Sequence, residues 1–117
     1  LVFGCGGDRD KGKRPIMGRI GGELADLCIL TSDNPRTEDP MEILREIEEG
    51  IKETTGEYVV IENRRDAIRH ALEIGREGDI IVLCGKGHET YQETMGVKRP
   101  FDEKVVVQEL LTELRGE

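Results

Sequence analysis

The stretch that decides the fold is LVFGCGGDRDKGKRPIMGRIGGELADLCILT, residues 1–31. It begins with an apolar run, Leu1–Cys5, and ends with another, Leu27–Thr31, and each run predicts a strand. Between them, Pro15 suits the first position of a helix. The apolar residues that recur at helical spacing are Met17, Ile20 and Leu24. A strand, a helix and a strand joined so closely predict a right-handed βαβ crossover with parallel strands.

Three glycines interrupt this predicted helix, at Gly18, Gly21 and Gly22. Each weakens a helix by roughly 1 kcal/mol relative to Ala. We expect close packing against a neighbouring backbone to compensate for that loss.

The same alternation continues after the first unit. Asp39 is placed to cap a helix with Pro40 at its first position and Glu42 as a capping-box acid. The residues expected to be buried on that helix are Ile43, Leu44, Ile47 and Ile51. Tyr58–Ile61 predicts a third strand. Asn63 caps a further helix that ends near Gly75 or Gly78, with Ile68, Ala71 and Leu72 on one face.

Ile80–Cys84 is the most apolar run, and we expect it to be a strand at the centre of the sheet. Thr90–Phe101 predicts a hairpin that turns at Gly96, with Pro100 on an edge strand. Asp102 then opens a final helix. The residues of that helix expected to face inward are Val106, Leu110 and Leu114.

These elements predict one α/β domain over residues 1–117: Rossmann-like, three-layered, with a mostly parallel sheet and an antiparallel edge strand or hairpin. Ligands bind such sheets beyond the carboxyl ends of the strands. The three segments expected there are the first loop (Gly6–Arg14), the second loop (Ser32–Glu38) and the third loop (Gly85–Thr90). The run that opens the chain, without Met, suggests a piece of a longer protein.

Composition limits the function. A net charge of −8 argues against a nucleic-acid or anionic-membrane surface, and no apolar stretch approaches the ~20 residues of a membrane span. Cys5, Cys28 and Cys84 are odd in number and form no CxxC pair. We therefore expect reduced thiols in a cytosolic protein, and neither disulfides nor a zinc site.

The first and second loops both offer partners for charged groups. From Asp8 to Arg14 the first loop carries four cations and two anions ahead of a helix, which suits a carboxylate or phosphate or, equally, a solvated turn. In the second loop, Asp33 and Asn34 precede Pro35, which could be a simple turn. Arg36, expected to be exposed, adds a bidentate fork for a carboxylate, while its neighbours offer acceptors for an ammonium.

The third loop resembles a phosphate-binding loop only superficially. Lys86 is followed by Gly87 and not by a hydroxyl residue, so the GxxxxGK[ST] pattern is missing and nucleotide hydrolysis by this loop is rejected. We expect His88 to be structural and, with His70 as the other histidine, no metal site. Glu89 could accept an ammonium or could be a surface carboxylate.

Together the three loops carry a resemblance that covers essentially the whole chain. Phe3–Pro15, the Asp33-Asn34-Pro35-Arg36 signature, and Gly85–Glu89 followed by Tyr91-Gln92 resemble, in that order, the third domain of the diaminopimelate-adding Mur ligases. The resemblance implies a bacterial, cytoplasmic, three-domain ligase in which ATP phosphorylates a D-glutamate carboxylate and a diaminopimelate amine attacks the acyl phosphate. The other two domains, which lie upstream and are absent from these residues, would bind the UDP-N-acetylmuramoyl dipeptide and ATP with Mg²⁺.

The resemblance also assigns residues. Those that would contact the distal end of meso-diaminopimelate are Arg9, Asn34, Arg36, Gly85 and Glu89. Asp33 and Pro35 would shape the second loop. No catalytic residue, metal ligand or cofactor is expected in this domain, which should be inactive alone, and Lys11–Arg14 cannot be placed relative to nucleotide phosphate.

Two alternatives stay open. The chain could be a free-standing amino-acid- or nucleotide-binding regulatory module, and the length of the natural chain would distinguish that case. It could also belong to a lysine-adding relative, although Arg36 argues against this, because such relatives lack the arginine.

Overall fold

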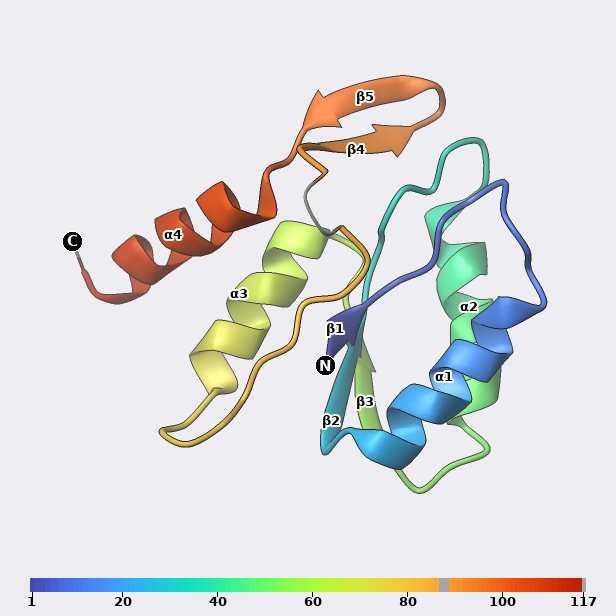
Figure 1. Ribbon diagram of the computed structural model, residues 1–117, viewed down its shortest axis with the longest axis horizontal. Helices are drawn as coiled ribbons and strands as arrows, with labels where there is room; N and C mark the ends of the chain where they lie inside the picture. The colour runs from blue at the N-terminus through green and yellow to red at the C-terminus, as the bar shows by residue number, and fades with distance from the viewer. Residues whose placement is uncertain (87–88, 117) are drawn as a thin grey trace.

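A computed structural model describes residues 1–86 and 89–116 and shows an α/β domain in three layers (Figure 1). The sheet consists of β1 (Val2–Phe3), β2 (Leu27–Leu30) and β3 (Glu57–Val60), parallel and in the order β1-β2-β3. Val2 is paired with Ile29, and Cys28 with Tyr58. The predicted α/β class with a parallel sheet is confirmed, although each strand is short.

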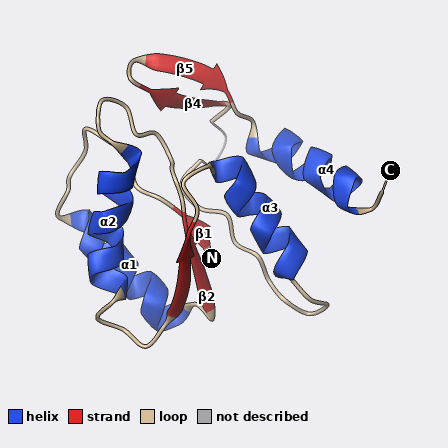
Figure 2. Cartoon of the chain, turned by 180° about the vertical axis from the view of Figure 1, so that it is seen from behind, coloured by secondary structure: helices blue, strands red, loops and turns tan. Residues whose placement is uncertain are grey.

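Helices cover both faces of this sheet, as Figures 1 and 2 show from opposite sides. On one face lie α1 (Lys13–Leu24) and α2 (Pro40–Ile51), while α3 (Arg64–Ile74) covers the other and α4 (Glu103–Leu114) packs against α3. Alternate strand residues point to opposite faces. Cys28 and Leu30 therefore pack with α2, and Ile29 packs with α3.

The predicted caps of the three later helices are confirmed, whereas α1 begins at Lys13, two residues before Pro15, so the predicted first position of that helix is wrong. The Asp39 side chain accepts a hydrogen bond from the Met41 N–H at 2.9 Å, and Asn63 accepts one from Asp66 at 3.0 Å. Asp102 caps α4 in the same way. In α2, the four residues expected inside are all buried, namely Ile43, Leu44, Ile47 and Ile51. In α4, Val106 and Leu110 are buried, but Leu114 is 39 % exposed, so its predicted inward position is wrong.

In α1 the glycines face the protein interior. A Cβ on Gly18 would lie 2.1 Å from the Ile47 carbonyl oxygen, and one on Gly50 of α2 would lie 1.8 Å from that of Pro15. The expected close packing of helix backbones is therefore confirmed. The apolar residues of α1 lie on its exposed side, namely Met17, Ile20 and Leu24.

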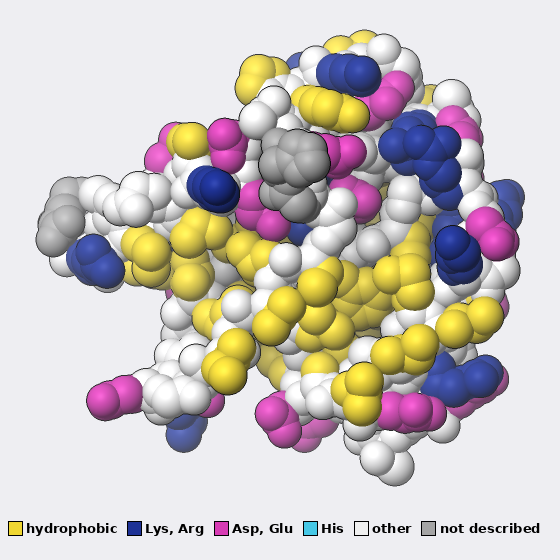
Figure 3. All heavy atoms as spheres, viewed as in Figure 1, with side chains coloured by type: hydrophobic (Ala, Val, Ile, Leu, Met, Phe, Trp, Pro, Cys, Tyr) yellow, Lys and Arg dark blue, Asp and Glu magenta, His cyan; other side chains and the backbone are white. Residues whose placement is uncertain are grey.

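Ile80–Cys84 is not the central strand that its composition predicts. It meets the sheet at the outer edge of β1, through a single parallel bridge between Val2 and Leu83. Ile80 is 87 % exposed, and the segment lines an open groove with α1 and β1. Figure 3 shows hydrophobic side chains gathered on this face. A continuous apolar run indicates only an affinity for apolar surroundings and does not specify a place in the sheet.

The predicted hairpin is present as β4 (Tyr91–Thr94) and β5 (Val97–Pro100), with Gly96 in the turn at a φ of +77°. It forms a separate two-stranded sheet, and Pro100 pairs at its end. A parallel bridge from Thr94 to Arg36 attaches it to the second loop. The hairpin is therefore positioned beside the candidate site.

Candidate functional site

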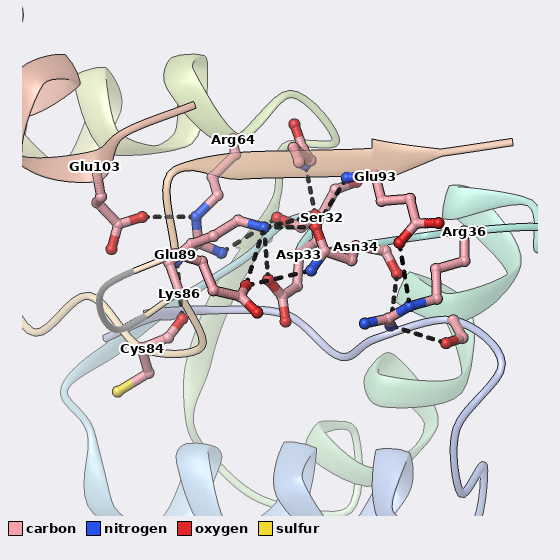
Figure 4. Close-up of polar contacts among 12 residues, drawn as sticks. Ser32, Asp33, Asn34, Arg36, Arg64, Cys84, Lys86, Glu89, Glu93 and Glu103 are labelled. Atoms are coloured by element: carbon pink, nitrogen blue, oxygen red, sulfur yellow. Dashed lines mark hydrogen bonds and ion pairs between the residues drawn. The ribbon is translucent and has the colours of Figure 1, made fainter. Parts of the chain in front are cut away.

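The three loops meet beyond the carboxyl ends of the strands, as the topology predicts (Figures 1 and 4). The first and second loops are joined directly. The Gly7 N–H donates to the Asn34 carbonyl oxygen at 2.7 Å, and the Thr37 hydroxyl donates to the Asp8 carboxylate at 2.5 Å. A Cβ on Gly7 would lie 1.8 Å from the Pro35 carbonyl oxygen. Glycine is therefore required where these loops cross, and the buried Pro35 forms the surface against which the first loop packs.

Arg14 and Glu38 hold the base of these two loops. The Arg14 guanidinium is 1 % exposed and donates to both oxygens of Glu38, at 2.7 and 3.1 Å, to Glu46, and to the Gly6 carbonyl oxygen. The hydrogen bond from Arg14, with one from the Asp8 N–H, lowers the pKa of Glu38 to about 2. Glu38 likewise raises the pKa of Arg14. Arg14 is therefore a structural cation, and Lys11, at 3.6 Å from Glu38, is partly neutralised.

Arg36 forms the cationic part of the site. Its φ of +54° places it in the left-handed region. Its guanidinium donates to the Gly7 carbonyl oxygen at 3.0 Å and lies 3.7 Å from the Glu93 carboxylate. The side chain is only 17 % exposed, so the expectation of an exposed Arg36 is wrong. The first loop packs on it and restricts its access to water.

Arg9 is exposed and lies close to the same point. A Cβ on Gly6 would be 2.7 Å from Arg36 Nη1 and 3.5 Å from Arg9 Cγ, so the two arginines flank Gly6. The backbone therefore brings together two of the cations that the sequence singled out. The Arg36 guanidinium beside Gly6 suits a carboxylate, and Arg9 adds a second cation near it.

Anionic groups occupy the neighbouring part of the site (Figure 4). The Asn34 amide nitrogen donates to the Glu89 carboxylate at 3.3 Å, and Lys86 Nζ lies 3.0 Å from Asp33 Oδ1. Gly85 has a φ of +109°, and a Cβ at this position would lie 3.5 Å from an oxygen of the Asp33 carboxylate. Asp33, Asn34, Gly85 and Glu89 therefore lie together, as the sequence pattern predicts.

Sequence reasoning did not assign a role to three charged residues of this region. Lys86, on the third loop, is buried against the second loop. Glu93, on β4, faces Arg36. Arg64 donates to the carbonyl oxygens of Ser32, at 3.2 Å, and Cys84, at 2.8 Å. The available signals were that Lys86 directly follows Gly85 after the apolar run Ile80–Cys84 and that Arg64 directly follows the cap Asn63.

Gly87 and His88 lie outside the described residues, so the expected structural role of His88 stays a prediction. In residues 1–86 and 89–116, no three His, Cys, Asp or Glu side chains are grouped to hold a metal ion. Within that same part of the chain, none of the helices combines the length and apolar character needed to cross a membrane.

The site therefore places the Arg36 guanidinium, with Arg9 nearby, at the same end of the sheet as the carboxylates of Asp33, Glu89 and Glu93. The arginines suit a carboxylate, and the acidic side chains suit an ammonium. An α-amino acid carries both groups on one carbon, so this arrangement fits the end of an amino acid.

The sequence belongs to a known family. Residues 1–87 match the profile of the "Mur ligase, glutamate ligase domain", so the chain belongs to that family and corresponds to its carboxy-terminal domain.

Several individual ligases resemble the chain more closely. It is 61 % identical over 113 residues to the UDP-N-acetylmuramoyl-L-alanyl-D-glutamate–2,6-diaminopimelate ligase of Caldanaerobacter subterraneus subsp. tengcongensis, and 55 % identical to that of Clostridium botulinum. Each match covers 97 % of this chain and 23 % of the relative. A solved structure of a ligase of the same name superposes with a TM-score of 0.92 at 47 % identity, over 97 % of this chain and 23 % of that one. The chain thus spans about a quarter of the length of these relatives.

Proposed function

We propose that this chain is the amino-acid-binding domain of a bacterial, cytoplasmic ligase. The ligase joins meso-diaminopimelate to UDP-N-acetylmuramoyl-L-alanyl-D-glutamate in peptidoglycan synthesis, using ATP and an acyl-phosphate intermediate. The names of its relatives support this substrate pair. The domain assignment covers residues 1–117, and domains upstream of them bind the UDP-sugar and ATP with Mg²⁺.

The observation that carries the proposal is the position of Arg36. Diaminopimelate differs from lysine by a carboxylate on its distal carbon, and Arg36 presents its guanidinium beside Gly6 and Gly7, with Arg9 next to it. Glu89 and the Gly85 backbone hold the ammonium of the same carbon. Asn34 completes the set, and Asp33 and Pro35 shape the loop.

The chemistry is assigned to the whole ligase. None of the proposed binding residues acts as a nucleophile or general base, since each meets the end of the amino acid that does not react. Residues 1–117 bind and orient the amino acid, and the ATP-dependent step takes place where the upstream domains meet this one.

Arg36 also bears on the two alternatives. A lysine-adding ligase has no distal carboxylate to bind, so it would have no ligand group for the Arg36 guanidinium to recognise. The length of the natural chain distinguishes a free-standing regulatory module from a ligase. A ligase should be about four times as long as this chain, as its relatives are, whereas a free-standing module should not.

The test is a calorimetric titration of the chain with meso-diaminopimelate and, separately, with L-lysine. We expect weak binding of diaminopimelate, because the upstream domains are missing, and at least roughly tenfold weaker binding of lysine, the loss that about 1.4 kcal/mol produces. Equal affinities for the two amino acids, or binding of lysine alone, would contradict the proposal.

A further inference from the structure

Lys86 is a buried ammonium inside the candidate site. Its side chain is 0 % exposed, and it contacts Asp33 and Asn34 of the second loop and Glu89 of its own loop (Figure 4). Nζ lies 2.7 Å from Asn34 Oδ1, 3.0 Å from Asp33 Oδ1 and 3.8 Å from the Glu89 carboxylate. A fully buried lysine is rare unless it is paired, and here all its partners are proposed site residues.

These contacts fix the direction of the Asn34 amide. Its oxygen accepts one hydrogen bond from Lys86 Nζ and a second, at 2.9 Å, from the Glu93 N–H. Two lone pairs are thereby used. The opposite orientation would place the amide NH₂ against two donors, so the network excludes it. The nitrogen therefore points away from Lys86, toward Glu89 at 3.3 Å.

Lys86 also sets the charge of the site. Asp33 and Glu89 bring two negative charges to one positive charge, so this group keeps one net negative charge. Without Lys86, two carboxylates and no cation would occupy this part of the site. Lys86 thus offsets one of the two negative charges and leaves the other for an incoming ammonium.

We propose that Lys86 is a positioning residue for amino-acid binding. It acts through Asn34, by making the amide nitrogen and not the oxygen the group that faces the ligand, and it does not contact the ligand itself. The inference rests on the proposed function, because it concerns how the same site recognises diaminopimelate.

The experiment is a double-mutant cycle in the full-length ligase, with meso-diaminopimelate as the varied substrate. The variants are Lys86→Met, Asn34→Ala and the two combined. We expect Lys86→Met to raise the KM for diaminopimelate by about 30-fold or more, the usual result of truncating one partner of a buried charge pair, while the KM for ATP changes less than about twofold. In the Asn34→Ala background, the additional effect of Lys86→Met should fall well below about 30-fold, because the amide that Lys86 orients is gone and only its charge beside Asp33 and Glu89 is still lost.

A purely structural role for Lys86 predicts a different result. Either Lys86→Met raises the KM for diaminopimelate equally with and without Asn34→Ala, or it lowers kcat and affects the use of every substrate to the same extent. Either outcome would overturn the inference and leave the proposed function standing. If Asn34→Ala and Arg36→Ala both leave diaminopimelate use unchanged, the site itself is wrong and both proposals fail.

Asn34→Asp provides a second test that does not depend on Lys86→Met folding. This variant keeps an oxygen for Lys86 and Glu93 but replaces the amide NH₂ with an acceptor. We expect a loss of diaminopimelate use at least as large as in Asn34→Ala, together with some loss of thermal stability, because the new carboxylate oxygen replaces the nitrogen that lies 3.3 Å from Glu89. Retention of normal diaminopimelate use would overturn the inference, because an oxygen would then serve at the ligand.

Discussion

At the scale of single residues, the loops owe their shape to buried charge. Arg14, 1 % exposed, is held by two carboxylates and a carbonyl oxygen, and Glu38 joins it to the first loop. The cationic run Lys11–Arg14 looked like a ligand-binding feature in the sequence. Its final cation is part of the interior, since a buried charge needs partners and finds them on α2 and in the second loop.

Glu38 gives a prediction about pH. Its pKa in the folded protein is about 2, against 4.5 for an ordinary glutamate. The stabilisation it provides is therefore complete above about pH 4.5 and is lost as the pH falls toward 2. Urea unfolding between pH 2 and 7 should show Glu38→Gln to be less stable than the unmodified chain near neutrality, with the difference narrowing in acid. Glu53→Gln, at an exposed ion pair with Arg19, is the matched control and should change little. A difference for Glu38→Gln that is constant with pH would contradict this account.

The cysteines give a second prediction at this scale. Within the described residues all three are free: Cys28 is buried, Cys5 is partly buried and Cys84 is exposed. Burial raises the pKa of the Cys5 thiol to about 11, so this group stays protonated and unreactive at neutral pH. Titration with a thiol reagent at pH 7.5 should detect one fast thiol in the native protein and three in denaturant. Fewer than three reactive thiols in denaturant without reductant would reveal a disulfide and contradict the prediction. The fast thiol should be absent from Cys84→Ser, which identifies Cys84 as its source.

At the scale of elements, the contact between α1 and α2 depends on missing side chains. Gly18 and Gly50 allow each helix backbone to touch the carbonyl oxygen of the other, at positions where a Cβ would lie 2.1 and 1.8 Å away. A helix this rich in glycine is weak alone, and the packing stabilises it.

The prediction is that Gly18→Ala destabilises the protein although it raises helix propensity. Propensity alone would contribute about 1 kcal/mol of stability, while overpacking against Ile47 costs typically 1–3 kcal/mol or more, so the net effect should be a loss. Leu24→Ala, at a site 81 % exposed on the same helix, serves as the control and should lie within about 0.5 kcal/mol of the unmodified protein. Denaturant unfolding at 25 °C measures both. A more stable Gly18→Ala variant would show that the helices separate easily.

Elements with local signals were predictable from the sequence. The caps at Asp39, Asn63 and Asp102 depend on residues within one turn, and each appears where expected. The central position predicted for Ile80–Cys84 was wrong, because its place depends on β1, where Leu83 meets Val2, and on an open groove that no local pattern reveals.

The site was predictable as a set of loops but not as a network. Parallel topology brings strand ends together, which explains why Asp33, Asn34 and Glu89 meet. The burial of Arg36 and Lys86 depends on how the first loop and the hairpin pack on them, which is tertiary information. Their roles therefore had to come from the structure.

At the scale of the whole molecule, the hairpin and the three loops enclose one end of the sheet. Arg36 connects them: its N–H donates to the Glu93 carbonyl oxygen at 3.0 Å and its guanidinium donates to Gly7. A substitution there alters packing as well as charge. Any test of the role of Arg36 must therefore compare two amino-acid substrates on the same variant. A loss of activity caused by altered packing then affects both substrates and cancels in their ratio.

The most direct measurement is kcat/KM for meso-diaminopimelate and for L-lysine in the full-length ligase carrying Arg36→Ala, with the exposed Arg45→Ala as control. Loss of a partner for a largely buried carboxylate costs about 2–5 kcal/mol, or roughly 30-fold to a few thousand-fold at 1.4 kcal/mol per tenfold. For Arg36→Ala we predict that loss in kcat/KM for diaminopimelate and little change or a gain in kcat/KM for lysine. For Arg45→Ala we predict no change in the ratio of the two kcat/KM values. Equal losses for both amino acids, or no loss for either, would contradict the claim that Arg36 recognises the distal carboxylate.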